Sequence, residues 1–224
     1  GIKLHTRIVY QDGETAPDQL ILKPAKASDK SEMDNLVVQE PDASNVFDRG
    51  YVDYRLFDSY CERGVRFVTR LRAKAIIDVM EVKSVDSSEP MIHDAIVRLG
   101  NPKVYQMKHP VRLIETKDDQ GNAIVIVTND LQMSASEIGD IYRHRWQIEL
   151  FFKWIKQHLQ VKRLYGTSAN AVYTQIRIAF ITYCLLLLLR CKIAYRGSLL
   201  MVYKLLRNCW AEPLAAMVRK LYGD

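Results

Sequence analysis

Residues 134–166 read SASEIGDIYRHRWQIELFFKWIKQHLQVKRLYG, and this stretch guides the interpretation of the whole chain. Ser134, followed three residues later by Glu137, is typical of a capping box at the start of a helix. The apolar side chains of the stretch recur at helical spacing and fall on one face, which predicts burial against a core. These side chains are Ile148, Phe151, Phe152, Ile155 and Leu159.

A polar group shares a second, narrow face of this predicted helix. On a continuous helix it lies within about 60° of arc, beside the apolar face. Its members are Tyr142, Arg145, Glu149 and Lys156. An ordinary solvated face with an Arg145–Glu149 ion pair explains this spacing by itself, because the two residues are four apart. Cations and carboxylates are also the groups that hold phosphates and metal ions, so both interpretations stay open.

Composition is that of a soluble globular protein with a basic balance. The chain has 224 residues, a formal net charge of +6 and a pI near 9.1. This charge favours a polyanionic partner only weakly. Four cysteines without metal-ligand spacing indicate reduced thiols in a cytoplasmic protein. The apolar run 178–189 is shorter than the roughly 20 residues of a membrane span, so we expect a buried core helix and no membrane partner.

The first part of the chain alternates strands and helices. We expect strands at 2–10 and 20–22, a helix over 28–38, a strand ending at Phe47, a helix over 51–63 and a strand over 65–71. Gly64 is the expected C-terminal cap of the second helix. This alternation is typical of a mixed α/β sheet.

Three parts follow from this pattern. Residues 1–71 form the first part of the core, 72–129 a β-rich insertion, and 130–224 a helical remainder. In the insertion, short alternating runs predict antiparallel strands at 76–85, 95–98, 110–115 and 123–128, with a turn at 118–122. In the remainder we expect further helices over 168–191, 197–210 and 214–222.

Two carboxylates are candidates for chemistry. Asp48 would stand at the C-terminal end of a short strand, where open sheets with parallel strands place their active sites. Glu149 would lie on the polar helix face. Phosphoryl transfer by two metal ions needs carboxylates from separate elements on ions about 4 Å apart, with cations nearby to hold phosphates. The residue types and their placement agree with that need.

The spacing Tyr142-x2-Arg145-x3-Glu149-x6-Lys156 resembles the Tyr-Arg-Glu-Lys signature of bacterial insertion-sequence transposases of the Asp-Asp-Glu (DDE) class, in the family usually numbered four. The flanks are also similar to that family, namely IKLHT at the start, DRGYVDYRLF from Asp48, FVTRL after it and RHRWQIELFFKWIKQHL around Glu149. The likeness covers essentially the whole chain. It implies an α/β fold with an RNase H-like mixed sheet flanked by helices and interrupted by a β-rich insertion.

The resemblance also implies roles for individual residues. Asp48 takes the place of the second catalytic aspartate and Glu149 that of the glutamate, and both would ligate two Mg²⁺ ions, with Mn²⁺ as an alternative. Tyr142, Arg145 and Lys156 would hold phosphates near the transposon end. Lys153, Lys162 and Arg163 add positive charge beside the signature and are further candidates for contact with the DNA backbone.

One departure from the family pattern concerns the first catalytic aspartate, which the family carries on a central strand upstream of the stretch that IKLHT resembles. We therefore expect a C-terminal fragment of a transposase, inactive by itself, in which the absent first core strand leaves a gap or an exposed edge.

The implied activity is metal-dependent strand cleavage and strand transfer at insertion-sequence ends. Its partners are double-stranded DNA, both transposon ends and target, and a second copy in a synaptic dimer, in the bacterial cytoplasm at the nucleoid. The alternative is a non-catalytic DNA-binding module on an RNase H-like scaffold. Trp146 and Trp154 are expected to be packing residues.

Overall fold

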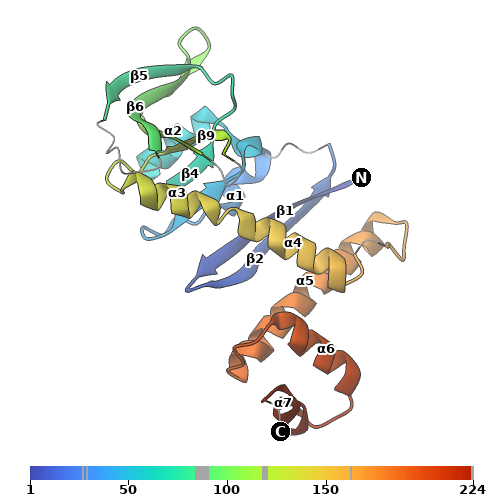
Figure 1. Cartoon of the computed structure of the whole chain (residues 1–224). Coiled ribbons are helices and arrows are strands. Elements are labelled where there is room, and N and C mark those ends of the chain that lie inside the picture. The colour runs from blue at the N-terminus through green and yellow to red at the C-terminus, as the bar shows by residue number, and fades with distance from the viewer. Residues whose placement is uncertain (27, 29, 84–90, 118–120, 162, 223–224) are drawn as a thin grey trace. The chain divides into compact units, whose positions relative to one another are not determined.

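The structure is a computed structural model that describes residues 1–26, 28, 30–83, 91–117, 121–161 and 163–222 (Figure 1). By their contacts the residues form two compact units. The first comprises Gly1–Arg7 and Gln19–Ile148, and the second Ile8–Asp18 and Glu149–Asp224. Each unit is described by itself.

A seven-stranded sheet is the centre of the first unit. Its strands are β3 (Ser44–Phe47), β4 (Arg66–Arg70), β5 (Ile77–Val82), β6 (Met91–Asn101), β7 (Tyr105–Gln106), β8 (Val111–Lys117) and β9 (Ala123–Thr128). They are ordered β3-β4-β9-β8-β6-β5, and β7 pairs with β6. Only β3 and β4 are parallel among the pairs of this sheet that the described residues form. The predicted mixed α/β class is confirmed, and the sheet with its flanking helices is consistent with an RNase H-like transposase fold.

The β-rich block continues the sheet that begins with β3 and β4. Its strand β9 pairs with β4 along Val68↔Thr128 and Arg70↔Ile126. The part boundaries at 71 and 129 therefore stay a prediction, while the strands themselves are confirmed. The predicted turn at 118–122 lies partly outside the described residues.

A hairpin of β1 (Ile2–Gln11) and β2 (Glu14–Pro24) forms a separate two-stranded sheet. Its turn places Asp12 and Gly13 both at positive φ, 53° and 81°. This is the pattern of a tight hairpin turn. β1 and β3 each have one edge that no described strand pairs.

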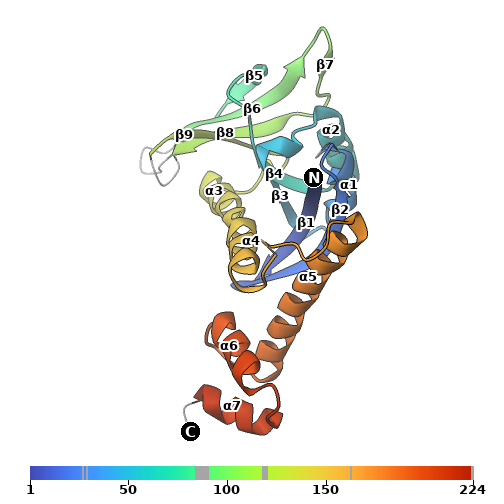
Figure 2. The same ribbon diagram turned by 90° about the vertical axis from the view of Figure 1, so that its right-hand side faces the viewer.

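Side-chain alternation divides the sheet into two faces, with α2 on one and α3 on the other (Figure 2). On one face α2 (Tyr54–Arg63) packs Phe57 and Tyr60 against Phe67, with the Phe57 and Phe67 rings stacked at 4.4 Å. On the other face α3 (Ala135–Arg143) packs against the odd partners of the same strands. The residues of this second cluster are Val68, Ile114, Ile124, Ile126, Ala135 and Ile138.

The long helix predicted from Ser134 is interrupted. The capping box is confirmed, but α3 ends at Arg143 and α4 (Trp146–His158) begins three residues later. At the break the amides bond three residues back, as in Arg145 N to Tyr142 O at 3.0 Å and Gln147 N to His144 O at 2.9 Å. This turn is tighter than an α-helix, so the 100° wheel does not extend across it. α4 then stops at His158, shortly before Gln160 at φ 51°.

The helix predicted over 28–38 is also shorter than expected. It consists of a 3₁₀ turn, η1 (Lys30–Glu32), and a single turn, α1 (Met33–Leu36). The Asn45 side chain accepts from the Val38 amide at 2.8 Å and donates to the Val38 carbonyl at 2.9 Å. These bonds hold the backbone after Leu36 extended, because they occupy both polar groups that a helix would use.

The second unit contains α4 from Glu149 on, α5 (Ala169–Lys192), α6 (Leu199–Cys209) and α7 (Leu214–Tyr222). Phe151 packs on Phe180 and Tyr183, and Trp154 on Tyr183 at 5.0 Å, which confirms Trp154 as a packing residue. Trp146 is 54% exposed, so the packing expectation does not hold for it.

The run 178–189, expected to form a buried core helix, lies in α5 and is buried in part, at Ala179, Phe180, Tyr183 and Leu186. α5 spans 24 residues and contains an apolar window with a mean hydropathy of 1.8, so by length and composition it could cross a membrane, and 33% of that window is buried. One side is buried and the opposite side is open. The open side carries Ile178, Ile181, Leu185 and Leu188, each more than half exposed.

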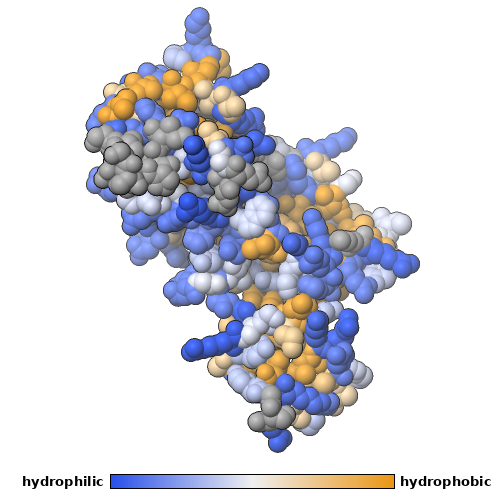
Figure 3. All heavy atoms as spheres, viewed as in Figure 1, coloured by the Kyte–Doolittle hydropathy of each residue, from blue (hydrophilic) through white to orange (hydrophobic). Residues whose placement is uncertain are grey.

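The far edge of the seven-stranded sheet is likewise open. Every residue of β5 is exposed, and apolar side chains gather over this edge in Figure 3. Val79 and Val82 are 51% and 62% exposed.

Asp58 joins α2 to the segment that follows β7. Its carboxylate is 5% exposed and accepts from the Tyr105 hydroxyl at 2.6 Å and from the amides of Lys108 and His109. Burial by itself would raise the pKa of Asp58, but these hydrogen bonds outweigh burial and lower it.

We expect Asp58→Asn to lower the free energy of unfolding by about 2–3 kcal/mol at pH 7, because an amide cannot accept all these donors. The folded-state pKa is lowered, so this stabilisation is complete above the ordinary Asp pKa of 3.8 and is lost as the pH falls through the folded value. Urea unfolding of both proteins at pH 7 and in acid should therefore show a difference in the free energy of unfolding that becomes smaller at low pH. Asp42→Asn, at an exposed position, is the control. A difference in the free energy of unfolding that does not depend on pH would contradict the stabilising role of the Asp58 carboxylate.

Gly64 caps α2 in the left-handed region at φ 69°, and its amide donates to Cys61 and Tyr60 carbonyls. A Cβ at this position would meet no atom within 4 Å, so substitution costs only backbone strain. We expect Gly64→Ala to destabilise the protein by about 1 kcal/mol and Gly64→Asn by less, since Asn tolerates this conformation. Denaturant unfolding of the pair measures the difference, and equal losses would argue against the strain.

Candidate functional site

Asp48 lies at the carboxyl end of β3, as predicted. The parallel register pairs Val46 with Val68 and Phe47 with Thr69, so its next step sets Asp48 beside Arg70, the last residue of β4. Asp48 is exposed, and its Oδ1 accepts from the Arg49 amide at 2.7 Å, starting the 3₁₀ turn η2 (Arg49–Tyr51). Two neighbouring parallel strands thus end in a carboxylate and a guanidinium.

Tyr142 approaches this pair from α3. Its ring packs with the apolar cluster on the α3 face of the sheet. Burial raises the pKa of the Tyr142 phenol, the charge of Asp48 adds to the rise, and Arg145 and Arg70 oppose it. The Arg145 guanidinium carbon lies 6.0 Å from the centre of the Tyr142 ring. These couplings define a first half-site in the first unit, consisting of Asp48, Arg70, Tyr142 and Arg145.

Arg70 is the member of this half-site that sequence reasoning missed. A sequence signal for Arg70 was present, because RFVTR is the next strand along the chain after the strand that precedes Asp48. Active sites lie at the carboxyl ends of parallel strands, and Arg70 is the last residue of RFVTR. What the sequence did not contain was the parallel pairing that makes the two ends neighbours.

A second half-site lies on α4, in the second unit. Glu149, Lys153 and Lys156 share one helix face and line an open hollow of about 440 Å³ with Phe152 and Gln157. The Lys156 ammonium lies 5.9 Å from the centre of the Phe152 ring. One carboxylate and two cations therefore border a single space, as their spacing within α4 predicts.

The two remaining predicted contacts do not belong to this face. Arg163 is exposed and lies beyond the end of α4, in a segment tied to α5 by the Gln175 amide, which donates to the Arg163 carbonyl at 2.8 Å. It is off the face because α4 stops at His158. Lys162 lies outside the described residues.

Asp48 and Glu149 belong to different units, so their convergence stays a prediction. Within the described ranges no group of three or more His, Cys, Asp or Glu side chains is placed to hold a metal ion. The chemistry of the two carboxylates nevertheless fits a hard cation such as Mg²⁺, which takes oxygen ligands and is commonly bound by one or two carboxylates.

Comparison with known proteins shows the family of the chain. A family described as the transposase DDE domain matches residues 1–185. A protein of Sinorhizobium fredii that bears the name of a transposase, y4zB, is 33% identical over 190 residues, which are 83% of this chain and 52% of that protein.

A second relative, from Geobacillus stearothermophilus, is named as a transposase for the insertion sequence element IS5377 and is 37% identical over 145 residues, 63% of this chain and 38% of its own. A third, from Synechocystis, is named for the element IS4SA and is 44% identical over 57 residues, 25% of this chain and 17% of its own. The chain thus spans about half, or less, of the length of these relatives. With the family match covering most of its residues, the chain belongs to the transposase DDE domain family of insertion sequences.

Proposed function

We propose that this chain supplies catalytic residues of a DNA transposase that cleaves and transfers strands at the ends of an insertion sequence. The observation that carries the proposal is the first half-site, where Asp48 and Arg70 end adjacent strands and interact with Tyr142 on α3, beside Arg145 in the turn that follows α3. Family membership supplies the reaction class, and the α4 face supplies a second carboxylate with two cations.

In this proposal Asp48 and Glu149 hold divalent ions, Mg²⁺ or Mn²⁺. When bound, such ions activate the attacking hydroxyl and stabilise the charge that develops on the phosphate. Arg145, Lys153 and Lys156 hold phosphates of the DNA backbone, and the Tyr142 hydroxyl donates to one of them while its ring fixes α3 on the sheet. Arg70 sits beside Asp48 and adds positive charge where a scissile phosphate would lie.

The resemblance extends this to a reaction sequence. Water cuts one strand at the element's end, and the freed 3′-hydroxyl attacks first the opposite strand, giving a hairpin, and later the target DNA. We propose that the protein acts as a homodimer on paired ends, in the cytoplasm at the nucleoid. On this view α5 packs with its neighbouring helices and does not enter a membrane.

A non-catalytic DNA-binding module is the second candidate, carried by the net charge of +6 and the cations of both half-sites. It predicts that DNA affinity depends on the cations and that the carboxylates are dispensable. The two functions therefore differ in the behaviour of Glu149.

We expect Glu149→Gln to reduce strand cleavage by more than about 100-fold and to leave DNA affinity within about twofold, because it removes a metal ligand and not a phosphate contact. The assay uses labelled element-end duplex, Mg²⁺ and a form of the protein that includes the upstream strand expected from the resemblance. Asp140→Asn, an exposed carboxylate on α3, is the control. Undiminished cleavage by Glu149→Gln would favour the binding module.

A third carboxylate, placed by the resemblance upstream of Ile2, is needed to complete the site. We therefore expect the 224-residue chain to bind the duplex and leave it intact in the same assay. Efficient cleavage by this chain alone would overturn the assignment of the third ligand.

Phosphate contacts are tested by the salt dependence of binding. We expect Arg145→Gln, Lys153→Gln and Lys156→Gln each to weaken binding of duplex DNA and to reduce the slope of log K against log [salt] by about 1. Fluorescence anisotropy of a labelled duplex between low and moderate salt measures the slope. Lys204→Gln, an exposed lysine on α6, should leave it unchanged; equal effects at all four positions would indicate a diffuse charge effect.

A further inference from the structure

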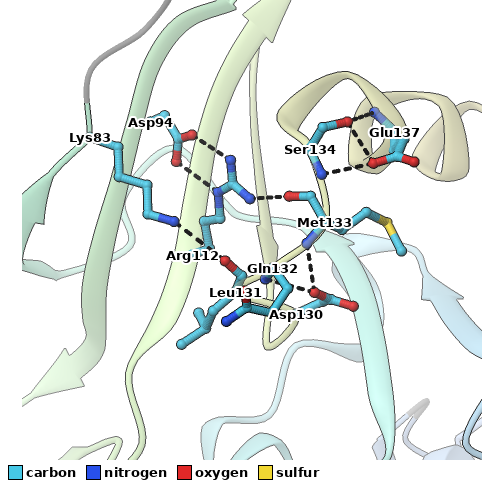
Figure 4. A network of polar contacts seen from close by, with 9 residues as sticks. All are labelled: Lys83, Asp94, Arg112, Asp130, Leu131, Gln132, Met133, Ser134 and Glu137. Carbon is cyan, nitrogen blue, oxygen red and sulfur yellow. Dashed lines mark hydrogen bonds and ion pairs between the residues drawn. The ribbon is translucent and has the colours of Figure 1, made fainter.

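A buried ion pair lies on the α3 face of the sheet, apart from the two half-sites. Arg112 on β8 and Asp94 on β6 have side chains only 7% and 8% exposed. Two guanidinium nitrogens bind the carboxylate, Nε to Oδ1 at 2.9 Å and Nη2 to Oδ2 at 2.6 Å (Figure 4). Replacing such a pair by apolar residues is often neutral or stabilising, so stability by itself does not explain its presence.

The third guanidinium nitrogen of Arg112 binds a residue outside the sheet. Its Nη1 donates to the carbonyl of Met133, in the segment 130–133 that connects β9 to α3. Lys83 donates to the Leu131 carbonyl in the same segment at 3.4 Å. The Asp130 carboxylate accepts the amides of Gln132 and Met133 at 2.9 and 3.0 Å, which closes the turn. The connecting segment is therefore fixed to the sheet by side chains from elsewhere in the chain.

This segment leads directly into the capping box of α3. The Ser134 amide donates to Glu137 at 2.8 Å, and the Glu137 amide donates to the Ser134 hydroxyl at 3.2 Å. Met133 and Ser134 are adjacent, so the position at which Arg112 holds the backbone is also the point where the helix starts. Figure 4 shows the ion pair, the turn and the cap as one connected network.

The apolar contacts of α3 alone leave its position under-specified. Ala135 and Ile138 rest on aliphatic side chains of the sheet, and such surfaces tolerate sliding and rotation because dispersion has little direction. Hydrogen bonds to fixed groups do have direction. Tyr142 lies eight residues after Ser134, about 12 Å along the helix, so a shift at the start is carried to the half-site.

We propose that Arg112, held by Asp94, is a positioning residue of the transposase site: it fixes the start of α3 and thereby the place of Tyr142 relative to Asp48 and Arg70. Its catalytic consequence rests on the proposed function. The placement of α3 does not, and it is measured separately.

Two variants separate positioning from stability. Arg112→Lys keeps a positive charge beside Asp94, but one ammonium cannot hold both carboxylate oxygens and also reach the Met133 carbonyl. The double variant Asp94→Leu with Arg112→Met keeps the interior filled and removes the tether, and Lys83→Met is a milder variant that removes only the contact to Leu131.

Hydrogen exchange and fluorine NMR of the 224-residue chain give the local readouts. We expect amide exchange in 134–143 to rise by about tenfold or more in Arg112→Lys and in the double variant, with a smaller rise in Lys83→Met. In protein labelled with 3-fluorotyrosine, the Tyr142 resonance, assigned through Tyr142→Phe, should shift or broaden. Asp58→Asn is the control, because it weakens the α2 side of the same unit: it should leave the Tyr142 resonance native, and any rise in exchange that it causes in 134–143 gives the contribution of global unfolding.

Native exchange in 134–143 together with a native Tyr142 resonance in the folded Arg112→Lys or Lys83→Met protein would overturn the proposal. In the cleavage assay we expect the same variants to lower the rate at saturating DNA by about tenfold while DNA affinity stays within about twofold. If the proposed function fails, wild-type protein shows no cleavage, and exchange and NMR still decide the placement of α3.

Discussion

The pairing of β4 with β9 is the constraint on which the first unit depends. β4 is parallel to β3 on one side and antiparallel to β9 on the other, so it joins the Asp48 strand to all the strands of the β-rich block. Asn129 extends the junction, since its side chain accepts from the Phe67 amide and donates to the Val65 carbonyl, both at 2.9 Å. Because side chains alternate along each strand, this one register also decides which residues meet α2 and which meet α3.

The same alternation explains why the half-site forms where it does. Arg70 is paired with Ile126, a member of the cluster beneath α3, so Arg70 stands on the α3 side of the sheet. Asp48, one step past Phe47 on the parallel neighbour, stands on that side as well. Tyr142 meets them because its ring belongs to the cluster beneath α3. A register shift of one residue in β4 would move Arg70 to the α2 face and separate it from Asp48 and Tyr142.

Polar groups perform a different task from the apolar faces. The two clusters bury apolar side chains on the two faces of the sheet and contribute the cohesion of the first unit. Asp58 on one face and the Arg112–Asp94 pair on the other bind backbone groups in the segments next to α2 and α3. In both places a buried carboxylate is satisfied by several donors, which is the condition under which burying a charge is tolerable.

The sequence by itself determined the local features. Ser134 with Glu137 marked the start of α3, Gly64 marked the end of α2, and the position of Asp48 after a short strand was correct, because each depends on residues a few positions apart. The spacing of Glu149 and Lys156 was also sufficient, since both lie on one uninterrupted helix, whereas Tyr142 and Arg145 lie before its start. Only the tertiary structure decided the strand order, the place of Arg70, the Arg112–Asp94 pair and the break at His144. The first three are set by contacts between segments far apart in the chain. The break at His144 is set by backbone hydrogen bonds at a position where the sequence has neither proline nor glycine. Local propensity predicts neither kind of feature.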